Sequence, residues 1–251
     1  IVVGRHDHLI IDKAKIKGAL ALRQSGFGRG ARQKIEKDEA EILSGVRGGE
    51  TLGSPLALCI RNRDYESWKA DMSDGECDLS SRAVTRVRPG HADLSGMLKY
   101  GQSDARNILE RASARETAIR VAAGEIFRQY LSALGVEIAG YVREVCGVKD
   151  GGRYAFNELA ASKKTGLGMI DPEAERAAEE KVSALKSAGD TAGGVVEVRV
   201  RGLKSGFGSC MTYADKLDAR LAGALMGIQA AKGVEVGIGF EAGSLSGKEV
   251  H

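Results

Sequence analysis

The sequence predicts an α+β fold, in one domain built from two similar halves. Three observations predict it: strand-like alternation, helix-like apolar stripes and a loose internal repeat. The chain has 251 residues, of which 43% are hydrophobic and 28% charged, as expected for a globular domain with a sizeable core. Glycine is abundant at 34 residues and aromatic residues are scarce at 5%, which indicates close backbone packing rather than aromatic stacking.

The strands are predicted from apolar residues that alternate with small or polar ones. Residues 49–62 begin as a turn and continue as a strand with Leu56, Leu58 and Ile60 on one face. Residues 189–202 repeat this pattern, with threonine and glycine at the same offsets and valines on the apolar face. We interpret the two segments as copies within a duplicated domain. Chance similarity between glycine-bounded strands is the alternative.

The helices are predicted from apolar residues at steps of three and four. A short helix is expected at 104–109, and the stripe from Ile108 to Ile126 predicts one continuous helix. Residues 217–228 have the same spacing. Segments 123–138 and 222–236 each resemble a helix that ends at glycine and leads into a strand, which extends the repeat. Residues 63–85 are expected to be solvated, and Pro172 to begin a charged surface helix.

Charge and cysteine content exclude several classes of protein. A net charge of +3 is too small for generic attraction to nucleic acid or membranes. No apolar run reaches the roughly 18 residues of a membrane span, and we expect no signal peptide. The cysteines are far apart without metal-ligand spacing, so we expect reduced thiols, a cytosolic protein and no metal site. Because the chain starts at Ile1 rather than methionine, we expect it to begin inside a longer protein.

The most informative stretch is 22–32, where three arginines stand among three glycines. Arginine presents planar, charged donors that suit phosphate and carboxylate, and glycine lets the backbone approach a ligand closely. A flexible basic loop, or an Arg-Gly segment that binds RNA, is the alternative interpretation. The periodic segments on both sides favour a pocket wall for a small polyanion.

Two further segments carry chemistry. A turn at Pro89 and Gly90 is expected to hold Arg88 close to His91, and histidine is suited to a general-acid role. A surface or hydrogen-bonding histidine is the competing hypothesis.

Downstream, Ser113 followed by Glu116 is a capping-box pattern, which predicts a helix N-terminus able to bind an anion between Arg111 and Arg115. The alternative is an ordinary cap whose arginines pair with Glu110 and Glu116. Three arginine-rich elements in one chain favour a shared pocket.

Taken in order, these segments resemble the chorismate synthase family. Residues 23–30, Arg-Gln-Ser-Gly-Phe-Gly-Arg-Gly, are similar to its Arg-Gln-Gly-Gly-Tyr-Gly-Arg-Gly signature. Segments similar to its later blocks follow in the same order, at 42–47, 88–93, 110–117, 215–221 and 232–235. The family's N-terminal Gly-Glu-Ser-His-Gly block is absent from the sequence, as are its C-terminal Lys-Pro-Thr flavin loop and catalytic aspartate. Val87 stands where the family usually has proline.

The resemblance implies a carbon–oxygen lyase that forms chorismate from 5-enolpyruvylshikimate 3-phosphate by anti-1,4-elimination of phosphate. Reduced FMN is the implied cofactor, and NADPH is implied only for a bifunctional enzyme that reduces its own flavin. The implied fold is a single domain over residues 1–251, with helices sandwiched between two antiparallel β-sheets and an internal pseudo-twofold repeat. A cytoplasmic homotetramer is implied, with a small-molecule substrate and neither a nucleic-acid nor a membrane partner.

The resemblance also assigns site residues. Substrate contacts are implied for Arg23, Arg29, Arg32, Arg88, Ser113 and Arg115. Protonation of the reduced flavin system is implied for His91, as the catalytic residue. Flavin contacts are implied for Ala112, Ser113, Ala114, Gln229 and Ala230. The alternatives are a catalytically incomplete family member, and an anion- or RNA-binding module that uses the same arginine-rich loops.

Overall fold

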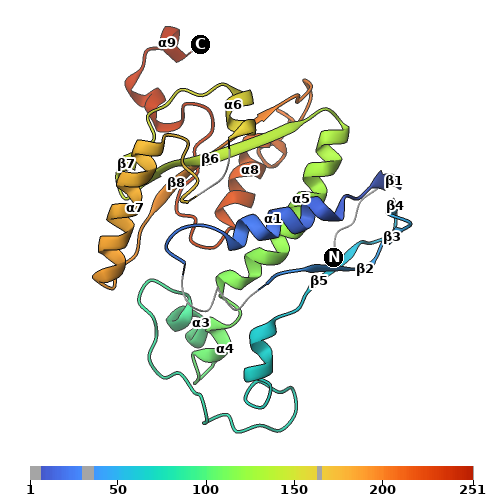
Figure 1. Ribbon diagram of the computed structural model, residues 1–251, viewed down its shortest axis with the longest axis vertical. Helices are drawn as coiled ribbons and strands as arrows, with labels where there is room; N and C mark the ends of the chain where they lie inside the picture. The colour runs from blue at the N-terminus through green and yellow to red at the C-terminus, as the bar shows by residue number, and fades with distance from the viewer. Residues whose placement is uncertain (1–6, 30–36, 163–165, 251) are drawn as a thin grey trace.

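Two antiparallel sheet layers enclose a pair of long helices. The computed structural model describes residues 7–29, 37–162 and 166–250. Figure 1 shows α1 (Lys13–Gln24) and α5 (Thr117–Ala133) crossing the middle of the molecule, with β-strands on both sides. The α5 helix contacts α1, β5 (Ala57–Ile60) and β6 (Glu137–Val145), so it joins the two layers. The predicted α+β class is confirmed.

The first layer consists of two small sheets, which the chain connects directly from β2 (Ala40–Ser44) to β3 (Val46–Arg47). Its other strands are β1 (Asp7–Ile10), β4 (Glu50–Leu52) and β5. The pairings are β1 with β4, β4 with β3, and β2 with β5. The chain bends at Gly45, whose φ is 86° and where a Cβ would lie 2.6 Å from the Leu56 Cα. The strand predicted within 49–62 is present as β5, and Leu56, just before it, is buried.

The second layer has the order β7-β6-β8, with β7 at Val148–Lys149 and β8 at Gly194–Arg201. Helices α6 (Phe156–Ala161) and α7 (Pro172–Ser187) cover one face of it. Pro172 begins α7 as predicted, and the Asp171 carboxylate caps it by accepting from the Glu173 N–H at 2.9 Å. None of the helices in the described ranges is long and apolar enough to cross a membrane.

The main core lies between the two central helices and the first layer. Ile16 and Leu20 of α1 pack with Ala122 and Ile126 of α5, above Leu56 of the first layer. All five side chains are at most 5% exposed. Burying large apolar side chains in this way is the main stabilising contribution to the fold. As a result, the last turn of α1 lies against the start of α5.

The expected continuous helix from residue 108 to 126 is wrong. Helix α4 (Arg106–Leu109) ends before a turn at 110–113, and a short helix, η2 (Ala114–Glu116), then leads into α5. Ser113 caps η2, because its Oγ accepts the Arg115 N–H at 3.3 Å. The break therefore falls where the capping pattern placed a helix start. Upstream, η1 (Arg63–Ser67) lies in the expected excursion, and α3 (Asp93–Tyr100) packs on α4.

The internal repeat is not confirmed. Helix α8 (Leu217–Met226) follows η3 (Tyr213–Asp215), but it ends at Gly227, and residues 231–236 form neither helix nor strand. The Gly227 N–H closes the last turn on the Gly223 carbonyl, and Ala230 then has a φ of 69°. A left-handed residue cannot continue a helix. The chain proceeds through η4 (Gly239–Ser244) to α9 (Gly247–Val250).

Candidate active site

Arg23 connects α1 to the start of α5. It lies in the last turn of α1, and its Nε and Nη2 donate to the Thr117 hydroxyl at 3.2 and 3.0 Å. Nη2 also donates to the Ala114 carbonyl at 3.1 Å. The Thr117 hydroxyl donates in turn to that carbonyl at 2.6 Å. These bonds fix the guanidinium at a junction that the core packing has already positioned.

Asp38, just before β2, bonds two of the expected arginines. Arg115 Nη1 donates to one carboxylate oxygen at 2.5 Å, and Arg23 Nη1 donates to the other at 3.3 Å. The Asp38 side chain is only 1% exposed. Arg115 Nη2 also donates to the Arg61 carbonyl at 3.3 Å. We call Arg23, Asp38 and Arg115 the Asp38 cluster.

Arg29 lies within electrostatic range of this cluster. Burial lowers the pKa of Arg29, the Arg23 guanidinium lowers it further, and Asp38 raises it. The loop that carries Arg29 is fixed by a hydrogen bond of 3.1 Å, which the Phe27 N–H donates to the Gly166 carbonyl. Among the described residues, Arg23 and Arg115 therefore bond one buried carboxylate with Arg29 within electrostatic range, and this surplus of positive charge suits an anion.

The turn at 112–114 connects the Asp38 cluster to the segment after α8. Gln229 Nε2 donates to the Ala112 carbonyl at 3.1 Å. The other amide atom, Oε1, is buried and has no hydrogen-bond partner within the described part of the chain. Because Nε2 faces a carbonyl, the acceptor Oε1 is the atom left over. A buried unpaired acceptor costs about 1–3 kcal/mol, so this site suits a ligand with an N–H group.

Arg88 and His91 lie on a neighbouring turn. The His91 N–H bonds the Arg88 carbonyl at 3.4 Å, across Gly90 with its φ of 72°, as the Pro-Gly turn predicted. The Arg88 side chain forms a two-pronged bond to buried Asp93, at 2.9 Å on each side. These bonds lower the pKa of Asp93 to about 2. The hydrogen bond to Asp93 is the main cause that raises the pKa of Arg88, and the Glu110 charge adds to it, so Glu110 lies within electrostatic range of this turn.

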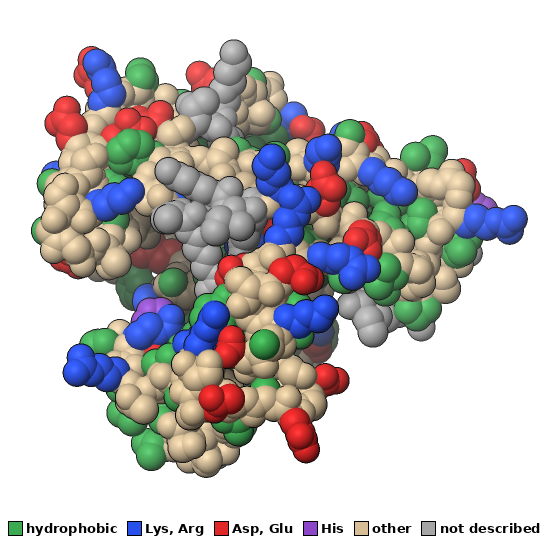
Figure 2. Space-filling model, turned by 60° about the horizontal axis from the view of Figure 1, so that its bottom comes forward, with side chains coloured by type: hydrophobic (Ala, Val, Ile, Leu, Met, Phe, Trp, Pro, Cys, Tyr) green, Lys and Arg blue, Asp and Glu red, His purple; other side chains and the backbone are tan. Residues whose placement is uncertain are grey.

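The expected site residues fall into three sets. Those at the Asp38 cluster or the turn beside it are Arg23, Arg29, Ala112, Ser113, Ala114, Arg115, Gln229 and Ala230. Those on the adjacent turn, without a bond to the cluster among the described residues, are Arg88 and His91. Arg32 lies outside the described residues. Figure 2 turns the lower end of Figure 1 forward and shows Lys and Arg side chains around a hollow in that face.

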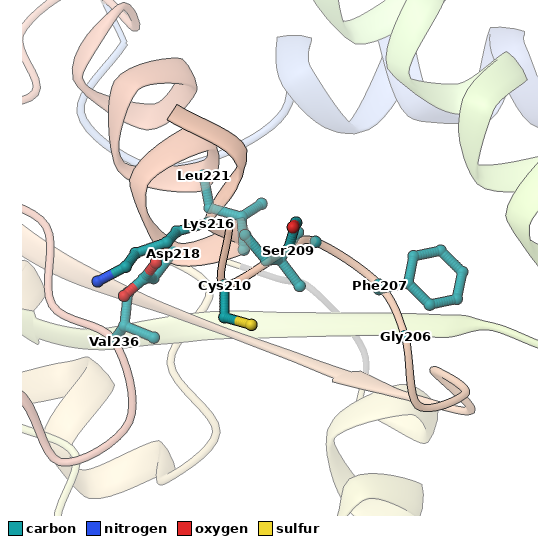
Figure 3. Close-up of a pocket in the computed structure, with 10 residues that line it drawn as sticks. Gly206, Phe207, Ser209, Cys210, Lys216, Asp218, Leu221 and Val236 are labelled. Carbon is teal, nitrogen blue, oxygen red and sulfur yellow. The ribbon is translucent and has the colours of Figure 1, made fainter. Parts of the chain in front are cut away.

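A separate cavity of about 740 Å³ lies beside α8, lined mainly by the 206–210 loop. Figure 3 shows Lys216 and Asp218 at its rim, with Leu221 and Val236 among its apolar residues. None of the expected site residues that the structure describes lines it. In the described ranges, no group of three or more His, Cys, Asp or Glu side chains is arranged to hold a metal ion. The expected site residues that the structure describes therefore lie at the arginine-rich junction and the turn beside it, apart from this cavity.

Comparison with known proteins decides the family. The family model described as chorismate synthase matches residues 1–251. This chain belongs to the chorismate synthase family. Chorismate synthase of Geobacter metallireducens is 51% identical over 256 residues, which cover 100% of this chain and 65% of that protein. Chorismate synthase of Pelobacter propionicus is 54% identical over 239 residues, 94% of this chain and 61% of that protein.

A solved structure agrees in fold. A crystal structure titled as chorismate synthase superposes with a TM-score of 0.78 at 38% identity, over 99% of this chain and 67% of that one. The chain thus spans slightly less than two thirds of these curated chorismate synthase relatives. Glu110 and Glu116, the partners expected in the alternative interpretation, pair with Arg106 at 3.6 Å and Arg120 at 2.9 Å, while Arg115 pairs with Asp38.

Sequence reasoning missed two residues of this arginine-rich junction, Asp38 and Thr117. Asp38 stands in a run of mixed charges, Lys37-Asp38-Glu39, where nothing marks one acidic residue as buried. Thr117 opens α5 and reads as an ordinary helical residue. The one available signal was that a cluster of arginines needs a counter-charge, and the 36–39 segment is the nearest acidic stretch after the Arg-Gly loop.

Proposed function

We propose that the protein to which this chain belongs is a chorismate synthase, and that this chain supplies its anion-binding residues. The proposed reaction is the anti-1,4-elimination of phosphate from 5-enolpyruvylshikimate 3-phosphate. One observation carries the proposal: Arg23 and Arg115 bond the buried Asp38 carboxylate, and Arg29 lies within electrostatic range of it. Fixed guanidiniums at a junction of buried elements are suited to a phosphate dianion.

Charge favours this substrate. Among the described residues of this junction, the guanidiniums of Arg23, Arg29 and Arg115 outnumber the Asp38 carboxylate, which favours a dianion such as phosphate. The same groups stabilise the charge that develops as the phosphate departs, and such preorganised donors are among the largest contributions to catalysis. Arg88 bonds Asp93 through Nε and Nη2, and its side chain is 43% exposed. Its remaining N–H donors therefore suit a substrate carboxylate.

The residues present fit the proposed flavin. The orphaned Oε1 of Gln229 offers a buried acceptor to an N–H group of a flavin ring, beside the backbone of Ala112, Ser113 and Ala114. Ala230, which follows Gln229 and has a left-handed backbone, is proposed to contact the flavin beside it. Reduced FMN, when bound, supplies electron density that assists loss of the phosphate. NADPH belongs to the proposal only for a bifunctional enzyme.

His91 is proposed to hold or deliver a proton at this site. It lies two residues before Asp93, whose carboxylate accepts from the Arg88 side chain at 2.9 Å, so the three residues share one turn. A positioned histidine contributes about 10²–10⁴-fold to catalysis. We further propose that the protein is a cytoplasmic homotetramer, as the resemblance implies.

The test is an anaerobic assay of the full-length protein with reduced FMN and 5-enolpyruvylshikimate 3-phosphate. We expect chorismate to form, followed by its ultraviolet absorbance, with one phosphate released per chorismate. Absence of product, together with RNA retention that falls steeply with salt, would favour the nucleic-acid alternative. Flavin binding and turnover that are both absent would favour an incomplete family member.

A further inference from the structure

We propose that Asp38 is a positioning residue that aims Arg23 and Arg115 at the substrate anion. This inference rests on the proposed function of the same site. Asp38 touches no substrate atom in the proposal; it acts through the two guanidiniums. It connects three elements of the fold, because its partners lie at the end of α1 and in η2, just before α5, while Asp38 itself precedes β2.

The bonding pattern divides the Arg23 guanidinium into a held part and a presented part. Nε and Nη2 of Arg23 are occupied by Thr117 and the Ala114 carbonyl. Nη1 carries two N–H groups, of which Asp38 takes one. Asp38 therefore fixes the direction in which the second N–H of Nη1 points. Arg115 is held likewise, between Asp38 and the Arg61 carbonyl.

Repulsion explains why a carboxylate is needed here. Arg23 lowers the pKa of Arg29, which shows that the two cations act on each other, and Asp38 opposes this effect. Without Asp38, the guanidiniums would separate toward solvent, because like charges at short range repel. Removing one partner of a buried charge network is strongly disruptive, since the remaining charges are left uncompensated.

Positioning and bulk electrostatics predict opposite results for Asp38→Asn. The substitution makes the site more positive by one charge, so an electrostatic role alone predicts tighter anion binding. A positioning role predicts weaker binding despite the added positive charge. A purely structural role predicts a lower melting temperature with an unchanged KM for the folded enzyme.

The experiment measures KM, kcat and melting temperature for full-length Asp38→Asn and Asp38→Glu enzymes. Glu41→Gln is the matched control, because Glu41 pairs with Arg61 on the exposed surface and its loss also removes one negative charge. We expect KM for the phosphorylated substrate to rise about tenfold or more in both Asp38 variants, as a displacement of about 1 Å costs up to 10²-fold. The control is expected to keep the wild-type KM.

Asp38→Glu keeps the charge and displaces the carboxylate, so it carries the test if Asp38→Asn does not fold. An unchanged or lower KM in the folded Asp38 variants overturns the proposal. Calorimetric binding of inorganic phosphate separates this proposal from the proposed function. If wild type makes no chorismate but binds phosphate, and Asp38→Glu weakens that binding, the function fails and the positioning role stands. If phosphate binding is equal in both proteins, the positioning role fails.

Discussion

Gln229 donates from Nε2 to the carbonyl of Ala112, at 3.1 Å and across 117 positions of sequence. This bond attaches the segment after α8 to the turn that precedes α5. It also orients the amide, because only the nitrogen can donate to a carbonyl. The buried Oε1 is thereby presented next to the Asp38 cluster with its acceptor capacity unused by the described residues.

Replacing Gln229 with leucine should weaken FMN binding. The variant keeps a similar volume but removes the buried acceptor, and one hydrogen bond is worth about 0.5–1.5 kcal/mol, or roughly 2- to 12-fold in Kd. Fluorescence titration with FMN measures the effect. Gln102→Leu is the control, since Gln102 bonds Asn107 near α4 instead. Equal FMN affinity in wild type and Gln229→Leu contradicts the assignment.

Arg29→Ala should raise KM and lower kcat, because the role proposed for its guanidinium is to bind the phosphate and to stabilise its departure. Losing a charged hydrogen bond costs about 1.5–3 kcal/mol, or roughly 10- to 150-fold in kcat/KM. Arg29→Lys should recover only part of the loss, as lysine lacks the planar fork. Arg47→Ala, on the exposed β3 strand, serves as the control. Steady-state kinetics that match wild type for Arg29→Ala count against the site.

His91→Ala should lower kcat while KM changes little, because a proton-transferring group acts mainly on the chemical step. The expected fall in kcat is about 10²–10⁴-fold. A control at His8, which lies on β1 and pairs with Glu50, should leave turnover unchanged. Loss of substrate affinity without loss of kcat would assign His91 to binding instead.

The Arg88–Asp93 pair should give the fold an acid-sensitive contribution. Hydrogen bonds from Arg88 lower the pKa of Asp93 from 3.8 to about 2. The stabilisation is therefore fully present above about pH 4 and is lost as the pH falls through about 2. Asp93→Asn should melt at a lower temperature than wild type at neutral pH, and the difference should shrink on acidification. A difference in melting temperature that is constant over this pH range rules the effect out.

Local patterns predicted much of the fold and part of the site. Pro172 and the Asp171 cap mark the start of α7, and Ser113 marks the start of η2, because capping depends on a few adjacent residues. The break at 110–113 was overlooked because an apolar stripe continued across it. The repeat failed at 227–236, where a left-handed Ala230 is invisible in the sequence pattern.

Residues that act through burial were harder to predict. The arginines were recognisable by type and spacing, but their counter-charge Asp38 is defined by a tertiary junction of three elements. The role of Gln229 likewise depends on contact with a turn far away in sequence. The family resemblance pointed to Gln229, whereas nothing in the sequence pointed to Asp38.

Affinity for 5-enolpyruvylshikimate 3-phosphate, compared with its dephosphorylated counterpart, tests the central claim most directly. The account predicts that the full-length wild-type protein prefers the phosphorylated compound by about 100-fold, as expected for phosphate held by several charged hydrogen bonds. Arg29→Ala and Asp38→Glu should each reduce that ratio. Equal affinity for the two compounds in wild type, or a ratio that neither variant alters, would contradict the claim that this arginine cluster holds the phosphate.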